Sequence, residues 1–203
     1  MGDVKALCGE GVEVFKSQIK PGEAGQRDIL DGERIRTEGA TLRAFHCPGH
    51  TVDHMALVLE EEDAMFTGDN VLGHGTAVFE DLAAYMRSLE GMQGQFGGRA
   101  YPAHGAVIEE GVAKIREYIS HRREREEQIL AVLKQEPVKV EGVGEKEGWS
   151  SMGVVKVVYK DYPESLWGPA EAGVIQVLKK LEGEGRVREL ADGKWVIGAK
   201  SAL

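Results

Sequence analysis

Three polar residues with the chemistry of metal ligands follow short apolar segments of this 203-residue chain: His50, Asp69 and His104. Imidazole nitrogens and carboxylate oxygens are the ligands that hydrolytic zinc sites use. A carboxylate suits the position between two ions, because one of its oxygens can bridge both cations and offset their repulsion. The three residues are far apart in the sequence, so we expect strand-end loops to bring them together at one edge of a sheet. The expected chemistry is metal-dependent hydrolysis, with Asp69 as both a catalytic and a metal-binding residue.

The segments that precede these residues have the apolar pattern of β-strands. Four such segments are residues 40–45, 55–59, 64–67 and 99–101. The first, third and fourth end shortly before His50, Asp69 and His104, and the second and third are expected to pair as an antiparallel hairpin. Earlier in the chain, residues 12–15 predict a strand and residues 31–34 predict a hairpin turn.

Apolar residues at helical spacing predict one helix over residues 81–89 and a long helix over 111–135. The middle of the long helix, residues 121–127, is almost wholly charged, which is typical of a solvated helix face. Pro137 and the stretch 141–148, rich in Gly, Glu and Lys, indicate a linker. The predicted organisation is a first domain over residues 1–135, a linker over 136–148 and a second domain over 149–203.

The second domain has the order helix, helix, two-stranded hairpin, which is typical of a winged-helix module. Its expected helices and strands cover residues 152–159, 169–184, 186–190 and 194–197. Such modules often bind DNA, but the basic residues of this region are balanced by acidic ones. Nucleic-acid affinity depends on a surplus of Lys and Arg. Packing or dimerisation is therefore the expected role of this module.

Composition narrows the class of protein further. The formal net charge of −9 argues against a general polyanion binder. The two cysteines, Cys8 and Cys47, form neither a disulfide framework nor a CxxC pair, which favours a reducing compartment and a cytoplasmic location. No apolar segment approaches the ~18 residues of a membrane-spanning helix, and residues 1–5 lack a signal-peptide core. No membrane association is expected.

Three further residues near the candidate ligands have competing interpretations. His54 either orients the site through a hydrogen bond or is purely structural. His74, between two glycines, is either a cleft residue near the substrate or a solvent-exposed loop residue. Cys47 is expected to be a small buried residue and not a nucleophile, because no basic partner adjoins it.

The surroundings of the three candidate ligands resemble the metallo-β-lactamase superfamily. Residues 47–51 (Cys-Pro-Gly-His-Thr) resemble its Thr-Pro-Gly-His-Thr segment, residues 67–69 its bridging-aspartate segment, and residues 102–105 (Pro-Ala-His-Gly) its terminal Pro-Gly-His-Gly. Residues 68–82 and 114–122 are similar to the β-lactamase-like protein 2 branch. Within that branch, the chain looks closest to the fungal atrochrysone carboxyl carrier-protein thioesterases, which act beside non-reducing polyketide synthases.

This resemblance implies an α/β fold, the αββα sandwich of the metallo-β-lactamases, followed by a winged-helix-like domain. It places His50 on a first zinc ion, His104 on a second and Asp69 between them, with His54 and His74 as outer or cleft residues. The implied reaction is zinc-dependent hydrolysis of a thioester, which releases a polyketide acid in fungal secondary metabolism. The implied partners are an acyl-carrier protein and its small-molecule acyl thioester.

The family's remaining ligands come from a His-x-His-x-Asp-His motif, which does not occur among the six histidines of this chain. Relatives have a segment like residues 2–5 just after that motif. We therefore expect the chain to begin past the motif, with an N-terminally truncated sandwich and an uncovered apolar sheet face. Two other functions stay open. One is a metal-dependent RNA endonuclease of the same branch, against which the net acidity argues. The other is a non-catalytic fragment, which the absent motif favours. The metal identity also stays open, because these ligands accept zinc, manganese or iron.

Overall fold

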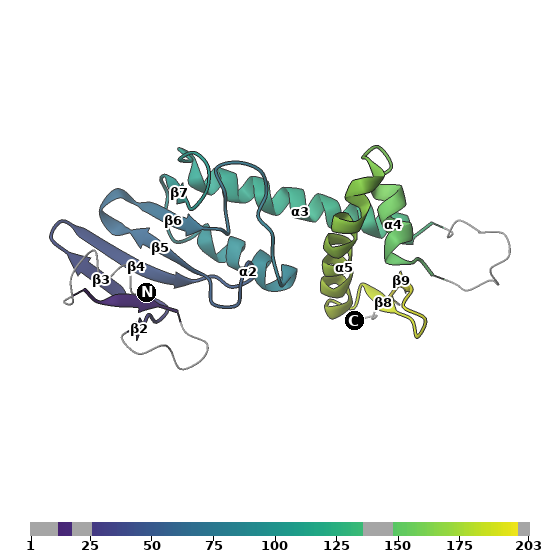
Figure 1. The fold of residues 1–203 in the computed structure, drawn as a ribbon, viewed down its shortest axis with the longest axis horizontal. Helices are drawn as coiled ribbons and strands as arrows, with labels where there is room; N and C mark the ends of the chain where they lie inside the picture. The colour runs from purple at the N-terminus through teal and green to yellow at the C-terminus, as the bar shows by residue number, and fades with distance from the viewer. Residues whose placement is uncertain (1–11, 18–25, 136–147, 199–203) are drawn as a thin grey trace. The chain divides into compact units, whose positions relative to one another are not determined.

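The structure, a computed structural model, describes residues 12–17, 26–135 and 148–198 (Figure 1). These residues fold into two compact units, and the boundary lies between Ile119 and Ser120. The boundary falls inside the long helix α3 (Gly111–Leu133), which contributes residues to both units. The predicted linker over 136–148 lies outside the described residues except for its last position.

The first unit is built on a five-stranded mixed sheet with the strand order β3-β4-β5-β6-β7 (Figure 1). Its strands are β3 (Arg34–Thr37), β4 (Ala40–His46), β5 (Met55–Leu59), β6 (Ala64–Gly68) and β7 (Ala100–Pro102). Strands β3 to β6 pair antiparallel in chain order, and β7 joins β6 in parallel. The C-terminal ends of β4, β6 and β7 therefore meet at one edge of the sheet. The β5–β6 hairpin, which turns through the short 3₁₀ helix η1 (Glu60–Glu62), is confirmed.

The predicted turn at residues 31–34 is present, with Glu33 N–H donating a hydrogen bond of 3.1 Å to the Leu30 carbonyl. It is not a hairpin turn, because the strand before it does not pair with β3. The tight turn of the first hairpin in this sheet is Glu38-Gly39, which joins β3 to β4. Asp31 is instead held against β4, because its carboxylate accepts a hydrogen bond of 2.8 Å from the backbone N–H of His46. Upstream, β1 (Val14–Lys16) and β2 (Gln26–Asp28) pair in parallel as a separate two-stranded sheet.

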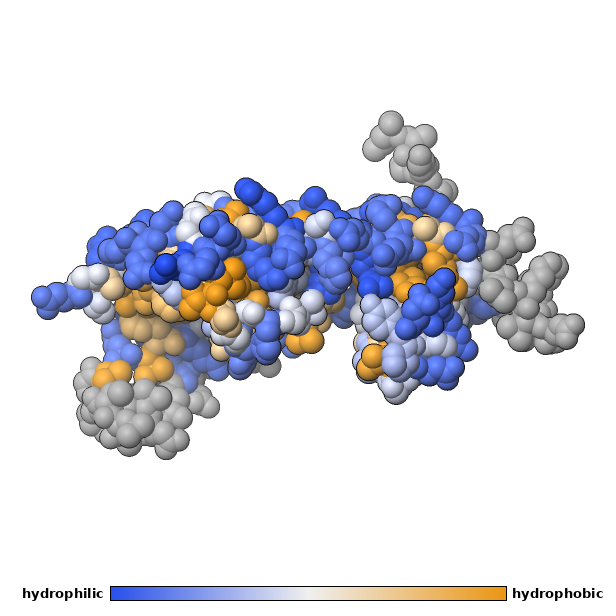
Figure 2. All heavy atoms as spheres, turned by 90° about the horizontal axis from the view of Figure 1, so that it is seen from above, coloured by the Kyte–Doolittle hydropathy of each residue, from blue (hydrophilic) through white to orange (hydrophobic). Residues whose placement is uncertain are grey.

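One face of the five-stranded sheet lies in the core, and the other carries exposed apolar side chains. Val58, Met65 and Ala100 are cross-strand partners on the first face and are at most 3% exposed. On the opposite face Phe66 pairs in register with Tyr101, and Phe66 is 41% exposed. Figure 2 shows such apolar surface, in orange, interrupting the hydrophilic surface of this unit.

Helix α2 (Leu82–Met92) covers part of the core face. It begins where Asp81 caps it, with the carboxylate accepting a hydrogen bond of 2.9 Å from Ala84 N–H. Its buried stripe recurs at helical spacing and includes Leu82, Tyr85, Met86 and Leu89. Its Gly91 lies against Phe45 of β4, where an added methyl carbon would come 3.0 Å from the ring. The predicted helix over 81–89 is confirmed.

The second unit has the predicted order of helix, helix and hairpin. Its elements are α4 (Ser151–Val158), η2 (Glu164–Leu166), α5 (Trp167–Gly183), β8 (Val187–Glu189) and β9 (Trp195–Ile197). Strands β8 and β9 pair antiparallel, and Trp149 forms a bridge to Trp195 beside them. Val154 and Leu178 are fully buried between the helices. Among the described residues, none of the helices combines the length and apolar character that crossing a membrane requires.

Candidate metal centre

His50, Asp69 and His104 meet at the sheet edge where β4, β6 and β7 end. Asp69 follows β6 directly, and the two histidines lie in the loops after β4 and β7. Asp69 Oδ2 is 3.7 Å from His50 Nε2, and Asp69 Oδ1 is 3.5 Å from His104 Nε2. The three side chains thus converge at one sheet edge, as the strand-end argument predicts, and each carboxylate oxygen faces a different imidazole.

These distances suit ligands of a shared ion better than direct hydrogen bonds. They exceed the ~2.7–3.2 Å of an ordinary N–H···O bond. Two ligands of one tetrahedral zinc ion, each about 2.0–2.1 Å from the metal, stand roughly 3.3 Å apart. The side chains of His50, Asp69 and His104 are 21, 37 and 68% exposed. The arrangement is that of a carboxylate between two imidazoles, of which His104 is the more exposed.

A backbone hydrogen bond to Nδ1 fixes the orientation of the His50 imidazole. Its Nδ1 donates a hydrogen bond of 2.8 Å to the Val78 carbonyl, which leaves the lone pair on Nε2 for the Asp69 side. Gly49, just before it, has φ +132°, and a Cβ at this position would stand 2.3 Å from the Cα of Tyr85 in α2. The Gly49 carbonyl accepts hydrogen bonds from the N–H groups of residues 80 and 81. Only glycine lets the His50 loop approach the start of α2 this closely.

The turn that carries Asp69 is packed against His54. His54 Nε2 accepts a hydrogen bond of 3.1 Å from Asp69 N–H, so His54 contacts the backbone of Asp69 and not its carboxylate. Gly68 has φ +55°, and a Cβ there would stand 2.6 Å from His54 Nε2. His54 therefore holds the turn that presents Asp69, which is the orienting alternative of the two interpretations from the sequence.

Cys47 lies on the other side of the same imidazole. Its Sγ is 3.3 Å from His54 Nδ1, so the expectation that no basic partner adjoins Cys47 is wrong. Burial raises the pKa of the Cys47 thiol to about 12, and burial also lowers the pKa of His54 to about 4. Both groups are thus neutral near pH 7, and Cys47 is fully buried as predicted. The pair is a packed contact and not an activated nucleophile.

Sequence reasoning missed the polar residues that brace these loops. Asn70 is fully buried and donates a hydrogen bond of 2.7 Å to the Cys47 carbonyl, while the Asn70 carbonyl accepts one of 2.6 Å from Tyr85 OH. Ser88 Oγ donates a hydrogen bond of 2.6 Å to the Pro48 carbonyl. The available signal was the placement of Tyr85 and Ser88 on the apolar stripe of the predicted helix, where a buried hydroxyl requires a partner.

The His104 loop is held by the loop that follows Asp69. Gly73 N–H donates a hydrogen bond of 2.9 Å to the His104 carbonyl. Tyr118 OH, from α3, donates one of 3.1 Å to the Gly75 carbonyl. His74, between these two glycines, has an exposed side chain, which matches the solvent-exposed alternative for this residue.

The described residues fit one half of a dinuclear site. In the part of the chain that the structure describes, no three His, Cys, Asp or Glu side chains converge on one point. Two pairs share Asp69 instead, so each ion would meet one imidazole and one carboxylate oxygen. A catalytic zinc ion has about three protein ligands. The donor set has the right chemistry for zinc, but it supplies fewer ligands than a closed coordination shell needs.

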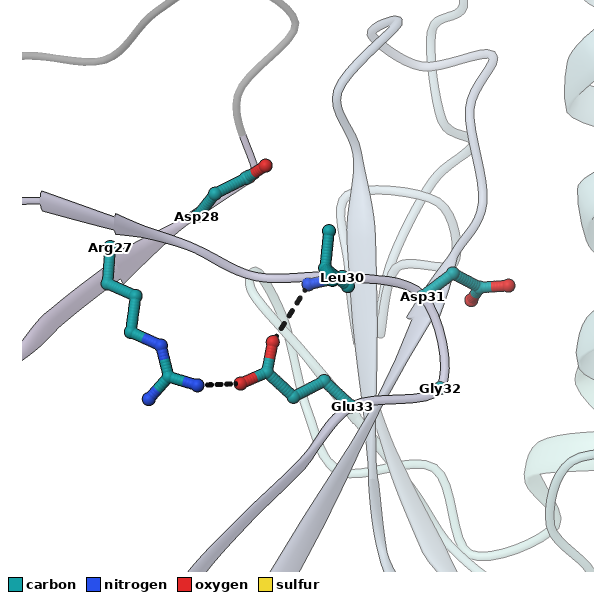
Figure 3. Close-up of a pocket in the computed structure, with 6 residues that line it drawn as sticks. All are labelled: Arg27, Asp28, Leu30, Asp31, Gly32 and Glu33. Carbon is teal, nitrogen blue, oxygen red and sulfur yellow. Dashed lines mark hydrogen bonds and ion pairs between the residues drawn. The ribbon is translucent and has the colours of Figure 1, made fainter.

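A hollow of about 540 Å³ lies elsewhere in the first unit, lined by residues 27, 28 and 30–33 (Figure 3). Glu33 closes one wall, because its carboxylate accepts a hydrogen bond of 3.0 Å from Leu30 N–H and pairs with Arg27. None of the three candidate ligands lines this hollow.

Two family profiles match the sequence. The profile of the metallo-beta-lactamase superfamily matches residues 3–104, and that of the beta-lactamase associated winged helix domain matches residues 150–195. A beta-lactamase-like protein 2 homolog of Drosophila melanogaster is 47% identical over 160 residues, which cover 79% of this chain and 52% of that protein. An atrochrysone carboxyl ACP thioesterase of Aspergillus chevalieri is 46% identical over 188 residues, which cover 91% of this chain and 59% of that protein. The chain thus spans little more than half the length of these relatives.

Solved structures share the fold. A beta-lactamase domain protein from Burkholderia ambifaria superposes with a TM-score of 0.71 at 18% identity, covering 87% of this chain and 53% of that one. A metallo-beta-lactamase family protein from Thermus thermophilus gives a TM-score of 0.64 at 23% identity, covering 85% of this chain and 54% of that one. The α/β class and the winged-helix module expected from the sequence are confirmed. By its motifs, its matched profile and its fold, the chain belongs to the metallo-β-lactamase superfamily.

Proposed function

We propose that this protein is a zinc-dependent hydrolase that cleaves an acyl thioester carried by an acyl-carrier protein and releases a polyketide acid. The observation that carries the proposal is the Asp69 carboxylate, whose two oxygens face His50 Nε2 and His104 Nε2 at 3.7 and 3.5 Å. The relative named as a carrier-protein thioesterase, 46% identical over 91% of this chain, supports the substrate class. The sequence has only two cysteines and no CxxC pair, which supports a cytoplasmic setting.

The roles of the chain's own residues follow from their environments. Zinc, when bound in such sites, supplies a hydroxide near neutral pH. Asp69 contributes the negative charge that offsets the repulsion between two cations. His50 can offer Nε2 as the ligating atom, because its Nδ1 donates its proton to the Val78 carbonyl. His104 is the most exposed of the three, so the acyl group is expected to approach from its side.

A metal-resolved activity assay tests this proposal. We expect hydrolysis of an acyl thioester of a small thiol to stop on exhaustive chelation and to return on addition of zinc. Asp69→Asn should lower kcat/KM by at least about 100-fold, because even substitutions outside the ligand shell cost 10–100-fold. Asp53→Asn is the matched control at the same sheet edge. The Asp53 carboxylate accepts a hydrogen bond of 2.7 Å from the Thr51 hydroxyl, which an amide oxygen also accepts. Hydrolysis that survived chelation or Asp69→Asn would overturn the zinc mechanism.

The ligand count favours a second candidate, a non-catalytic partner protein. The described residues provide two ligands for each ion, fewer than the three of a catalytic zinc. Metal analysis of the purified chain separates the two candidates. One or two zinc ions per chain, together with hydrolysis, support the enzyme. A zinc content well below one per chain, without hydrolysis, supports the non-catalytic role.

A further inference from the structure

A cluster of exposed and half-buried aromatic rings and cations surrounds the connection between α4 and α5 in the second unit. This α4–α5 patch consists of Arg125, Lys156, Tyr159, Tyr162, Leu166 and Trp167. The rings of Tyr159 and Tyr162 meet edge to face with centroids 5.6 Å apart, and Trp167 Nε1 donates a hydrogen bond of 3.3 Å to the Tyr159 carbonyl. Tyr162 and Leu166 are 53 and 49% exposed. Large apolar surface is thus presented to solvent by a segment that its own contacts hold in place.

Two cations lie on the faces of these rings. The Arg125 guanidinium is 4.5 Å from the centre of the Tyr159 ring, and Lys156 Nζ is 5.8 Å from the Trp167 ring. The ring contacts fix the position of each charge without neutralising it. Two other cations of this unit, Lys180 and Arg186, pair with carboxylates instead.

No carboxylate among the described residues forms an ion pair with Arg125 or Lys156. Asp161 and Glu164 belong to the same connection, but neither of them pairs with these two cations. The patch therefore combines unneutralised positive charge with exposed Tyr and Leu side chains. Tyr, Trp and Arg are the residue types that dominate the binding energy of protein interfaces.

We propose that the α4–α5 patch is the docking surface for an acidic protein partner, which under the proposed function is the acyl-carrier protein. The inference rests on the proposed function for the identity of that partner. The whole chain carries a formal charge of −9, so its net charge repels an acidic partner. A fixed pair of unneutralised cations is where such a partner docks without repulsion. Exposed Tyr162 and Leu166 supply the apolar contact that charge alone does not provide.

A nucleic acid fits this patch less well. Affinity for a phosphate backbone grows with the number of phosphates that Lys and Arg neutralise. The patch offers two such cations, in a chain whose acidic residues outnumber its basic ones by 34 to 25.

The test measures binding of the purified full chain to a fluorescently labelled acyl-carrier protein by anisotropy. Arg125→Glu with Lys156→Glu should weaken binding about tenfold or more, which corresponds to about 1.4 kcal/mol. The binding of the unmodified chain should fall as salt is added. Lys179→Glu with Arg188→Glu is the matched control, since it changes the net charge equally through two exposed cations outside the patch. Tyr162→Ser tests the apolar part alone and decides the question if the charge-reversed protein fails to fold.

Hydrolysis of a thioester of a small thiol, measured on the same proteins, separates this proposal from the proposed function. Weakened carrier binding with unchanged small-thioester hydrolysis supports the patch as the docking surface. Equal carrier binding by all variants overturns the patch and leaves the hydrolase standing. If the unmodified protein does not hydrolyse the small thioester, the proposed function itself is overturned. A further outcome would assign the patch to nucleic acid. In that case the unmodified chain binds a labelled single-stranded RNA, the charge-reversed variant alone does not, and carrier binding is the same in all variants.

Discussion

The two units hold their candidate functional side chains by opposite means. At the metal centre, loops are pressed together where no side chain fits: Gly49 lies against the backbone of Tyr85, and Gly68 lies against the ring of His54. In the α4–α5 patch, side chains rest on one another at the surface, as Arg125 does on Tyr159.

This difference separates positioning from recognition. Close backbone packing holds a ligand with little freedom, because there is no flexible side chain whose movement could displace it. It also makes the site sensitive to every added atom. A surface of stacked side chains tolerates substitution, so its variants report on binding more than on folding. Perturbations of the first unit should therefore cost stability, and those of the α4–α5 patch should cost affinity.

Gly49→Ala gives the largest expected effect. The added Cβ would stand 2.3 Å from the Cα of Tyr85, at a φ of +132°. Backbone cannot move aside as a flexible side chain can, so we expect the free energy of unfolding to fall by about 3 kcal/mol or more. Gly39→Ala is the matched control, because it also has positive φ (+81°) but nothing within 4 Å of the added carbon. Its expected cost is about 1–2 kcal/mol. Urea unfolding measures both, and equal losses would contradict the close-packing account.

Lys180→Met tests whether the second unit also has a buried polar contact that its fold requires. Glu126 is 4% exposed, and its carboxylate lies 2.9 Å from Lys180 Nζ. Removing the ammonium leaves a buried carboxylate with the more distant Arg186, at 3.9 Å, as its remaining cation. We expect a loss of about 2–3 kcal/mol in the free energy of unfolding. Lys179→Met, at the exposed neighbouring position, should change it by less than about 0.5 kcal/mol. Similar losses in both variants would show that the buried pair contributes nothing specific.

The convergence of His50, Asp69 and His104 was predictable because strand periodicity fixes where each strand ends, and strands that run in the same direction end at the same edge. The winged-helix order was predictable for a similar reason, since helix and strand periods differ. The bracing of the site was not. Asn70 and Tyr85 contact each other through a backbone carbonyl, and no side-chain pattern encodes such a contact.

The two wrong expectations have the same origin. The turn at Asp31 closes no hairpin, because β2 pairs in parallel with β1 and the Asp31 carboxylate bonds to His46 N–H of β4, a partner that is distant in sequence. The neighbour of Cys47 was missed because His54 reaches it only when the loop between them folds back. Local sequence reports local conformation, whereas both contacts depend on the tertiary arrangement.

A double-mutant cycle between Gly68 and His54 sharpens the comparison at the metal centre itself. The Cβ of Gly68→Ala would stand 2.6 Å from His54 Nε2, in a side chain that can be removed. We expect Gly68→Ala to cost about 2–3 kcal/mol in the unmodified protein. In a His54→Ala background only the backbone penalty of φ +55° remains, about 1 kcal/mol. The expected coupling free energy is therefore about 1–2 kcal/mol, a size typical of residues in direct contact. Urea unfolding of the four proteins measures it. Additive losses would show that the ring of His54 does not confine the Asp69 turn.

The smallest effect concerns Cys47, where the expected result is the absence of a reaction. Burial raises the pKa of the Cys47 thiol to about 12, so the thiol stays protonated at pH 8. Native protein should therefore take up iodoacetamide at Cys47 far more slowly than protein unfolded in urea, as peptide mass spectrometry can measure. His54→Gln should leave the native thiol unreactive, because burial and not the imidazole controls its pKa. If Cys47 reacted readily in the native protein and lost that reactivity in His54→Gln, the imidazole would be activating the thiol. Cys47 and His54 would then form a charged pair. The contrast between the packed candidate metal centre and the charged α4–α5 patch would fail at this position.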